Sequence, residues 1–301
     1  MSDQATDGPG ERPHVRIDFA RLRRPADLGV RRASVFLALG SNAANHIPSL
    51  PHQLDDRMSY HFVPSEISDE TRRQFNESFE AWIIGNALRD LVDAFAIFLK
   101  HCFPIQHMMA THSYIPTDLR ALAAEVEMLS ISAQYSRLRE LIGLDQRYWE
   151  MFESFRKARN CLSHRMGLVS RKDVNPENNR LLIRWSFLGV FMRHPDGTEQ
   201  PIDHEAIEAG RVATGPEAAM IVMRLTWKER SFAVGTNIRL TRHELSEICF
   251  AVHMATDHVI AKLNEFSIAQ GIEAEHPVAD PGTFQGVSIT MRSSAEPFCT
   301  P

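Results

Sequence analysis

Residues 145–167 read DQRYWEMFESFRKARNCLSHRMG and carry the clearest structural signal in the chain. Asp145 is a typical first residue of a helix, and Gly167 is a typical stop. Between them, aromatic residues recur at largely helical spacing: Tyr148, Trp149, Phe152 and Phe155. The stretch therefore predicts an amphipathic helix that ends in an arginine- and histidine-containing segment.

Three other segments have apolar residues at helical spacing, so four long helices are expected. The first covers 68–100 and is closed by Pro104; the second covers 116–143. The last covers 241–270 and begins with a capping box at 241–244. Because each apolar stripe must be buried against the others, we expect a mainly α fold built as a four-helix bundle.

The segment between the third and fourth helices shows the two-residue period of strands. Apolar residues alternate there on both sides of a turn signal at 195–197, which predicts a small antiparallel β insertion at about 179–240. Residues 1–63 are rich in Pro, Gly, Asp and Arg, and only Val35 to Leu39 suggests a strand. We expect an irregular basic N-terminal arm at 1–63, a helical domain at 64–270 and an irregular C-terminal tail at 271–301.

Composition excludes several classes of protein. The 301 residues carry a formal net charge of −5, which argues against a protein that coats nucleic acid non-specifically. The four cysteines lie far apart without a CxxC pair, so neither a disulfide framework nor a zinc site is predicted. The N-terminal residues lack an apolar signal core, and no apolar run is long enough for a membrane span. We expect a soluble cytoplasmic protein without a metal or cofactor.

Arg159, Asn160 and His164 combine residue types that suit the chemistry of a phosphodiester. The planar guanidinium group can make two charge-assisted hydrogen bonds to a phosphate, and an imidazole can transfer protons near neutral pH. Asn160 and His164 share one face of the helix at i, i+4, whereas Arg159 lies on a neighbouring face. The arginine side chain must therefore curl round to reach the same phosphate.

Seven basic residues lie between 147 and 172, against two acidic ones, so a local positive patch is predicted within an acidic chain. Arg156, Lys157 and Arg165 are the expected substrate-binding residues in this patch. The alternative is that these charges form the solvated face of a surface helix. For Arg159 and His164, the alternative is that both cations favour the helix C-terminus, where the backbone dipole attracts positive charge.

Arg159, Asn160 and His164 also resemble the R-x(4-6)-H motif of the HEPN superfamily of helical nucleases and RNA-associated domains. The specific correspondence covers residues 145–173, with looser helical agreement over 68–167 and 241–270. The resemblance implies that Arg159 binds phosphate, His164 transfers protons and Asn160 supports them as catalytic residues. The β insertion departs from the minimal bundle of this superfamily, and its strands could either cover the cleft or extend it.

The resemblance further implies a homodimer in which two motifs share one cleft. The implied activity is metal-independent endoribonuclease cleavage of RNA, leaving 2',3'-cyclic phosphate and 5'-hydroxyl ends. Toxin, defence and RNA-processing roles all fit, and a toxin would have an antitoxin or another protein partner. The alternative function is a non-catalytic helical module that binds nucleic acid, a nucleotide or a protein.

Other polar and aromatic residues offer weaker candidates. His253 and Asp257, with the neighbouring His258, have spacing that could bind a metal, but no third ligand is evident, so packed or surface histidines explain them better. Asp90 or Asp93 could form an ion pair with the motif arginine or lie on a solvated face. Three aromatic residues could stack on bases or belong to the core: Trp82, Trp149 and Phe152.

Overall fold

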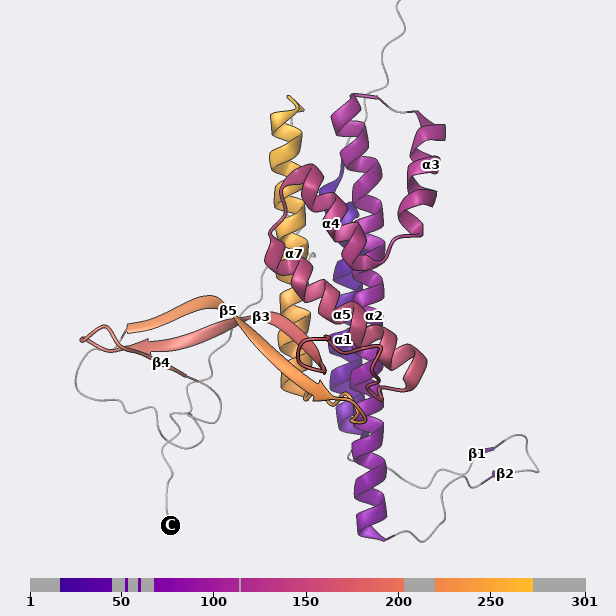
Figure 1. Cartoon of the computed structure of the whole chain (residues 1–301), viewed down its shortest axis with the longest axis vertical. Helices are drawn as coiled ribbons and strands as arrows, with labels where there is room; N and C mark the ends of the chain where they lie inside the picture. The colour runs from indigo at the N-terminus through magenta and orange to yellow at the C-terminus, as the bar shows by residue number, and fades with distance from the viewer. Residues whose placement is uncertain are drawn as a thin grey trace, which may run out of the picture.

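The computed structural model describes residues 17–44, 52–53, 59–60, 68–113, 115–202 and 220–272. Within these ranges the protein is mainly helical, with a three-stranded antiparallel sheet and a separate pair of two-residue strands (Figure 1). The short pair joins β1 (His52–Gln53) to β2 (Ser59–Tyr60). The expected mainly α fold with a small antiparallel sheet is therefore confirmed.

The described ranges contain six helices, and three long ones lie side by side: α1, α2 and α7 (Figure 1). Two shorter helices, α4 and α5, lie obliquely across α2, and α3 packs beside the end of α2. The bounds are α1 (Phe19–Ala44), α2 (Asp69–Thr111), α3 (Pro116–Glu127), α4 (Ile131–Ile142), α5 (Gln146–Arg165) and α7 (Arg242–Ala269). Within these ranges, no helix has an apolar stretch that could cross a bilayer.

The start of α2 matches the sequence prediction, but its end does not. Ser68 caps the helix by accepting a hydrogen bond from the backbone N–H of Thr71 at 3.1 Å. The prediction that Pro104 closes the helix is wrong, because α2 continues through it to Thr111. Proline removes only one backbone donor. The buried side chains of Phe103 and Met109 anchor the helix in the core before and after Pro104.

The expected second helix is two helices, α3 and α4. The chain leaves helical geometry after Glu127 and begins again when Ser130 accepts a hydrogen bond from Ala133 at 3.3 Å. The predicted end at Gly143 is confirmed, where a positive φ of 73° suits a residue without a side chain.

The N-terminal segment differs most from expectation. The prediction of an irregular arm is wrong for Phe19–Ala44, which form α1, and so is the strand suggested at Val35 to Leu39. α1 packs against α2 and α7 through small buried residues such as Ala26 and Ala33. At Gly29 an added Cβ would collide with Ala94 of α2, so the two backbones approach closely. The rest of segment 1–63, apart from residues 17–18 and the short strand pair, lies outside the described residues.

The β insertion is confirmed, with strand order β4-β3-β5. Its strands are β3 (Arg180–Arg193), β4 (Glu199–Pro201) and β5 (Met220–Ala233), and Gly197 occupies the predicted turn with φ 83°. Ile183 and Trp185 are fully buried where β3 packs on α5 and α7, while the other end of the sheet extends away from the helices (Figure 1). The predicted C-terminal tail lies outside the described residues beyond residue 272.

Aromatic packing fixes α5 on α2 and so positions the motif. Phe95 of α2 and Phe152 of α5 stack with ring centroids 4.0 Å apart, and Tyr135 of α4 and Phe155 border the same cluster. All four rings are fully buried. The predicted limits of this helix are confirmed, because Asp145 caps its start and left-handed residues follow Arg165.

Candidate functional site

Arg159 is held by one contact across the helix interface and one along its own helix. Its Nε donates a hydrogen bond to Oδ1 of Asp93 on α2 at 3.1 Å, and a terminal nitrogen donates to Oδ1 of Asn160 at 3.3 Å. Of the two acidic candidates, Asp93 therefore pairs with the motif arginine, whereas Asp90 pairs with Arg32 of α1. The bond to Asn160 shows that the guanidinium group curls toward the face that His164 shares.

His164 is exposed at the last turn of α5. Its imidazole has no hydrogen bond or ion pair to any residue in the described ranges. Because His164 lies four residues after Asn160, the two side chains leave the same side of the helix. The arrangement is an arginine fixed by a carboxylate and an amide, with an open imidazole one turn further along.

Two of the expected substrate-binding cations already have partners. Arg156 pairs with Glu153 on its own helix at 2.6 Å, and this pairing raises the pKa of the arginine. Lys157 Nζ donates to Oδ1 of Asn175 at 2.5 Å, which ties α5 to the loop before β3. Both side chains stay partly exposed, and only the charge of Arg156 is balanced by a carboxylate, because the partner of Lys157 is a neutral amide.

Arg165 also has a partner, and this contact is more buried. It pairs with Asp173, whose side chain is 3% exposed and also accepts hydrogen bonds from the backbone and hydroxyl of Ser170 at 2.8 Å. Burial alone would raise the pKa of Asp173, but the hydrogen bonds from Ser170 and Arg165 lower it below the usual range. The geometry gives Arg165 a part in closing the loop after α5.

Arg89 of α2 is a cation near the motif that sequence reasoning missed. It is exposed and lies midway between Gly85, which packs against Leu162 of α5, and Asp93, which binds the motif arginine. Its side chain has no ion pair to another described residue. On α5, the hydroxyl of Ser163, which follows Leu162 in the chain, is buried without a hydrogen-bond partner among the described residues. The sequence signal that could have identified Arg89 is its position four residues before Asp93, which puts both on one face of the helix.

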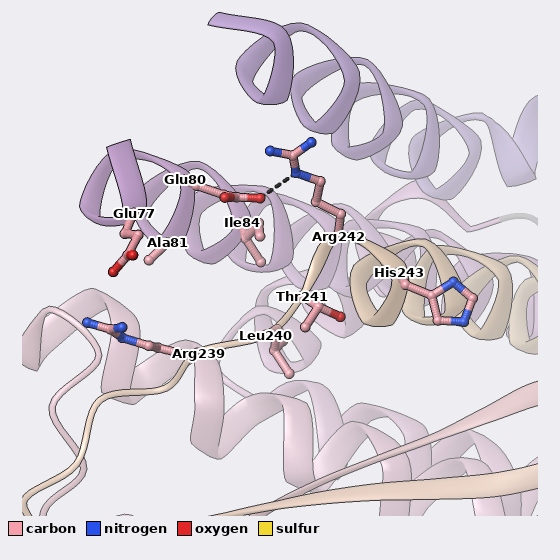
Figure 2. Close-up of a pocket in the computed structure, with 9 residues that line it drawn as sticks. All are labelled: Glu77, Glu80, Ala81, Ile84, Arg239, Leu240, Thr241, Arg242 and His243. Carbon is pink, nitrogen blue, oxygen red and sulfur yellow. Dashed lines mark hydrogen bonds and ion pairs between the residues drawn. The ribbon is translucent and has the colours of Figure 1, made fainter. Parts of the chain in front are cut away.

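A pocket lies elsewhere in the described residues, between α2 and the start of α7 (Figure 2). It has a volume of about 400 Å³ and is lined by Glu77, Glu80, Ala81, Ile84, Arg239, Leu240, Thr241, Arg242 and His243. Glu80 pairs with Arg242 and Glu77 pairs with Arg73, so much of its charge is neutralised. None of the motif residues of α5 lines this pocket.

The structure separates the three aromatic candidates for base stacking. Phe152 is fully buried in the core and Trp149 is partly buried beside α4. Trp82 of α2 is 64% exposed. Of these three, Trp82 is the only one that is mostly exposed.

The suggested metal-binding residues have other partners. Arg23 of α1 pairs with Asp257 at 2.9 Å and lies 3.5 Å from Nδ1 of His253. His258 Nε2 accepts a hydrogen bond from the backbone N–H of Asp145 at 3.0 Å, and burial lowers its pKa. No group of three His, Cys, Asp or Glu side chains in the described ranges could hold a metal ion.

Comparison with known proteins assigns no family. No family model matches the chain, and neither a curated protein nor a solved structure matches it. The class of site therefore follows from its own residues, a guanidinium group positioned by Asp93 and Asn160, with an exposed imidazole one helical turn after Asn160. Such a pair can bind an anion and move a proton.

Proposed function

We propose that this chain is a HEPN-like four-helix-bundle protein that cleaves RNA at Arg159 and His164 without a metal ion. The observation that carries the proposal is the Arg159–Asn160 hydrogen bond, which turns the guanidinium group toward the face of His164. Asp93 fixes the other side of the same group. A positioned cation and an open imidazole are the two groups that cleavage through the ribose 2'-hydroxyl requires.

In the proposed reaction, a base removes the proton of the 2'-hydroxyl and the 2'-oxygen attacks the adjacent phosphorus. The bond from phosphorus to the 5'-oxygen breaks, and that oxygen takes up a proton from an acid. The products are a 2',3'-cyclic phosphate and a 5'-hydroxyl. His164 transfers protons, and the remaining N–H groups of Arg159 bind the phosphate as its negative charge increases.

The need for both a base and an acid supports a homodimer. One motif supplies a single imidazole, whereas two motifs facing one groove supply two. The composite cleft of a homodimer would also add the second Arg159 to the binding of the phosphate. A toxin, defence or RNA-processing role, with an antitoxin or another protein partner, is compatible with this arrangement.

A second function is favoured by a different observation. Arg156 and Arg165 are both paired with carboxylates of the chain, so the positive charge available to RNA is smaller than the sequence indicates. This favours a non-catalytic helical module that docks a nucleic acid, a nucleotide or a protein. Such a module would bind without cutting.

The test is incubation of purified protein with mixed RNA in EDTA. The wild type should cut, and Arg159→Ala and His164→Ala should not. Matched controls are Arg120→Ala on α3 and the exposed His243→Ala at the start of α7, which should cut like the wild type. Equal cutting by every variant would remove the site, and RNA binding without cutting would favour the module.

A further inference from the structure

The outward face of α2 carries a row of residues that we call the α2 stripe. Its members alternate by three and four positions and so share one face of the helix: Arg72, Phe75, Phe79, Trp82, Asn86 and Arg89. The rings are well exposed, with Phe75 at 43%, Phe79 at 37% and Trp82 at 64%. Arg72 and Arg89 are 17 residue steps apart, which is a rise of about 26 Å along the helix.

Arginines lie at both ends of the α2 stripe. Arg72 and Arg89 are exposed, and neither side chain has an ion pair or hydrogen bond to another described residue. Asp69 and Asp93 continue the same spacing beyond the two arginines, and Asp93 pairs with Arg159. Glu77 and Glu80 instead leave the helix on another side and line the pocket beside α7 (Figure 2). They are also neutralised by ion pairs with Arg73 and Arg242. The α2 stripe is therefore positive at its ends and apolar between them.

The aromatic part has the geometry of a stacking surface. Phe79 and Trp82 have ring centroids 6.3 Å apart and planes only 13° apart, so their rings face in nearly the same direction. A solvent-exposed tryptophan can stack on any unpaired base, because every base has a π face. Flanking cations can bind the phosphates on either side of the stacked base.

A second copy of the chain is the other obvious occupant, and charge disfavours it. Antiparallel pairing that sets Phe79 against Trp82 of a second copy also sets Phe75 against Asn86 and Arg72 against Arg89. In-register parallel pairing sets each arginine against itself. Both arrangements bring unpaired like charges together, whereas a polyanion would neutralise the same two side chains.

We propose that the α2 stripe binds single-stranded RNA, with a base stacked on Trp82 and phosphates held by Arg72 and Arg89. Arg89 lies one helical turn from Asp93, which holds Arg159, so an RNA strand on the α2 stripe leads to the motif. Duplex RNA fits poorly because its bases are already stacked on one another. The choice of RNA rests on the proposed function, but the interaction is tested by binding and not by cleavage.

The experiment measures RNA affinity by fluorescence anisotropy in the His164→Ala background, where the RNA should stay intact. A labelled single-stranded RNA is compared with the duplex of the same sequence. Adding Trp82→Ala should weaken binding of the single strand by about 5- to 150-fold, the usual range for loss of one stacked base. Arg89→Ala should also weaken binding and reduce its salt dependence. The matched control, Trp149→Ala beside α4, should leave affinity unchanged.

Three results would overturn the inference: unchanged affinity after Trp82→Ala, equal binding of duplex and single strand, or no RNA binding at all. Sedimentation of the same variants identifies a protein interface, because Trp82→Ala would then change the assembly and leave RNA affinity intact. Failure here is separable from failure of the proposed function. Cleavage that depends on His164 but not on Trp82 removes only the stacking surface, and binding through Trp82 without cleavage removes only the nuclease.

Discussion

Replacing Arg159 with alanine should abolish activity while changing stability little. Its ion pair with Asp93 spans 3.1 Å between side chains that are 35% and 46% exposed. Partly exposed pairs of this kind contribute about 0.2–1 kcal/mol, because water screens the attraction and ordering two side chains costs entropy. We therefore expect Arg159→Ala to lower the free energy of unfolding by less than about 1 kcal/mol.

The measurement is urea unfolding followed by circular dichroism, with a double-mutant cycle of Arg159→Ala and Asp93→Ala. Two variants set the scale of structural residues on the same helix. Phe152→Ala, at a fully buried ring stacked on Phe95, should cost about 3–5 kcal/mol. Arg165→Ala, which leaves the buried Asp173 without its guanidinium partner, should cost about 3 kcal/mol.

The reasoning fails if Arg159→Ala loses more than about 2 kcal/mol, or if the cycle gives a coupling energy of that size. Either result would make Arg159 a structural residue, and its loss of activity would then reflect unfolding. A small stability change together with full loss of cleavage would locate its role in the site.

Three further outcomes are expected. Burial lowers the pKa of His258 below about 6.5, and its neutral Nε2 accepts a bond from Asp145, so the stability it contributes is present above that pH and is lost as the pH falls through the lowered pKa. The urea midpoint should therefore decrease less from pH 7.5 to pH 5.5 in His258→Gln than in the wild type. Thr241→Ala removes one half of the capping box of α7 and should cost about 0.5–2 kcal/mol in thermal unfolding, whereas Thr241→Ser should cost little. Relative to the wild type, the Arg89→Ala variant should lose more RNA cleavage at low salt than at high salt. An equal loss at both salt concentrations would argue against a phosphate contact.

Local sequence signals predicted much of the fold because their physics is local. Asp145 and Thr241 cap helices where expected, since a side-chain oxygen of each accepts a backbone N–H two or three residues on. The turn at Gly197 was predictable in the same way, because glycine readily adopts the positive φ that this position requires. Helix α1 was not predicted because it buries small residues such as Ala26 and Ala33, which give a weak hydropathy pattern. Its stability depends on close packing against α2, which no short stretch of sequence displays.

The candidate site was predictable only along its own helix. The spacing of Asn160 and His164 gave their shared face, and the curl of Arg159 followed from it. The partners of Lys157 and Arg165 come from the loop that follows α5, and Arg89 comes from α2. Those positions depend on tertiary packing, so the sequence overestimated the free positive charge on α5 and missed the cation on the neighbouring helix.

The chemical nature of the RNA ends tests the central claim most directly. Mass spectrometry of fragments formed in EDTA should show 2',3'-cyclic phosphate and 5'-hydroxyl ends with the wild type and none with His164→Ala, while His243→Ala matches the wild type. Cyclic phosphate ends formed equally by His164→Ala, or fragments with 5'-phosphate ends that require Mg²⁺, would contradict the account.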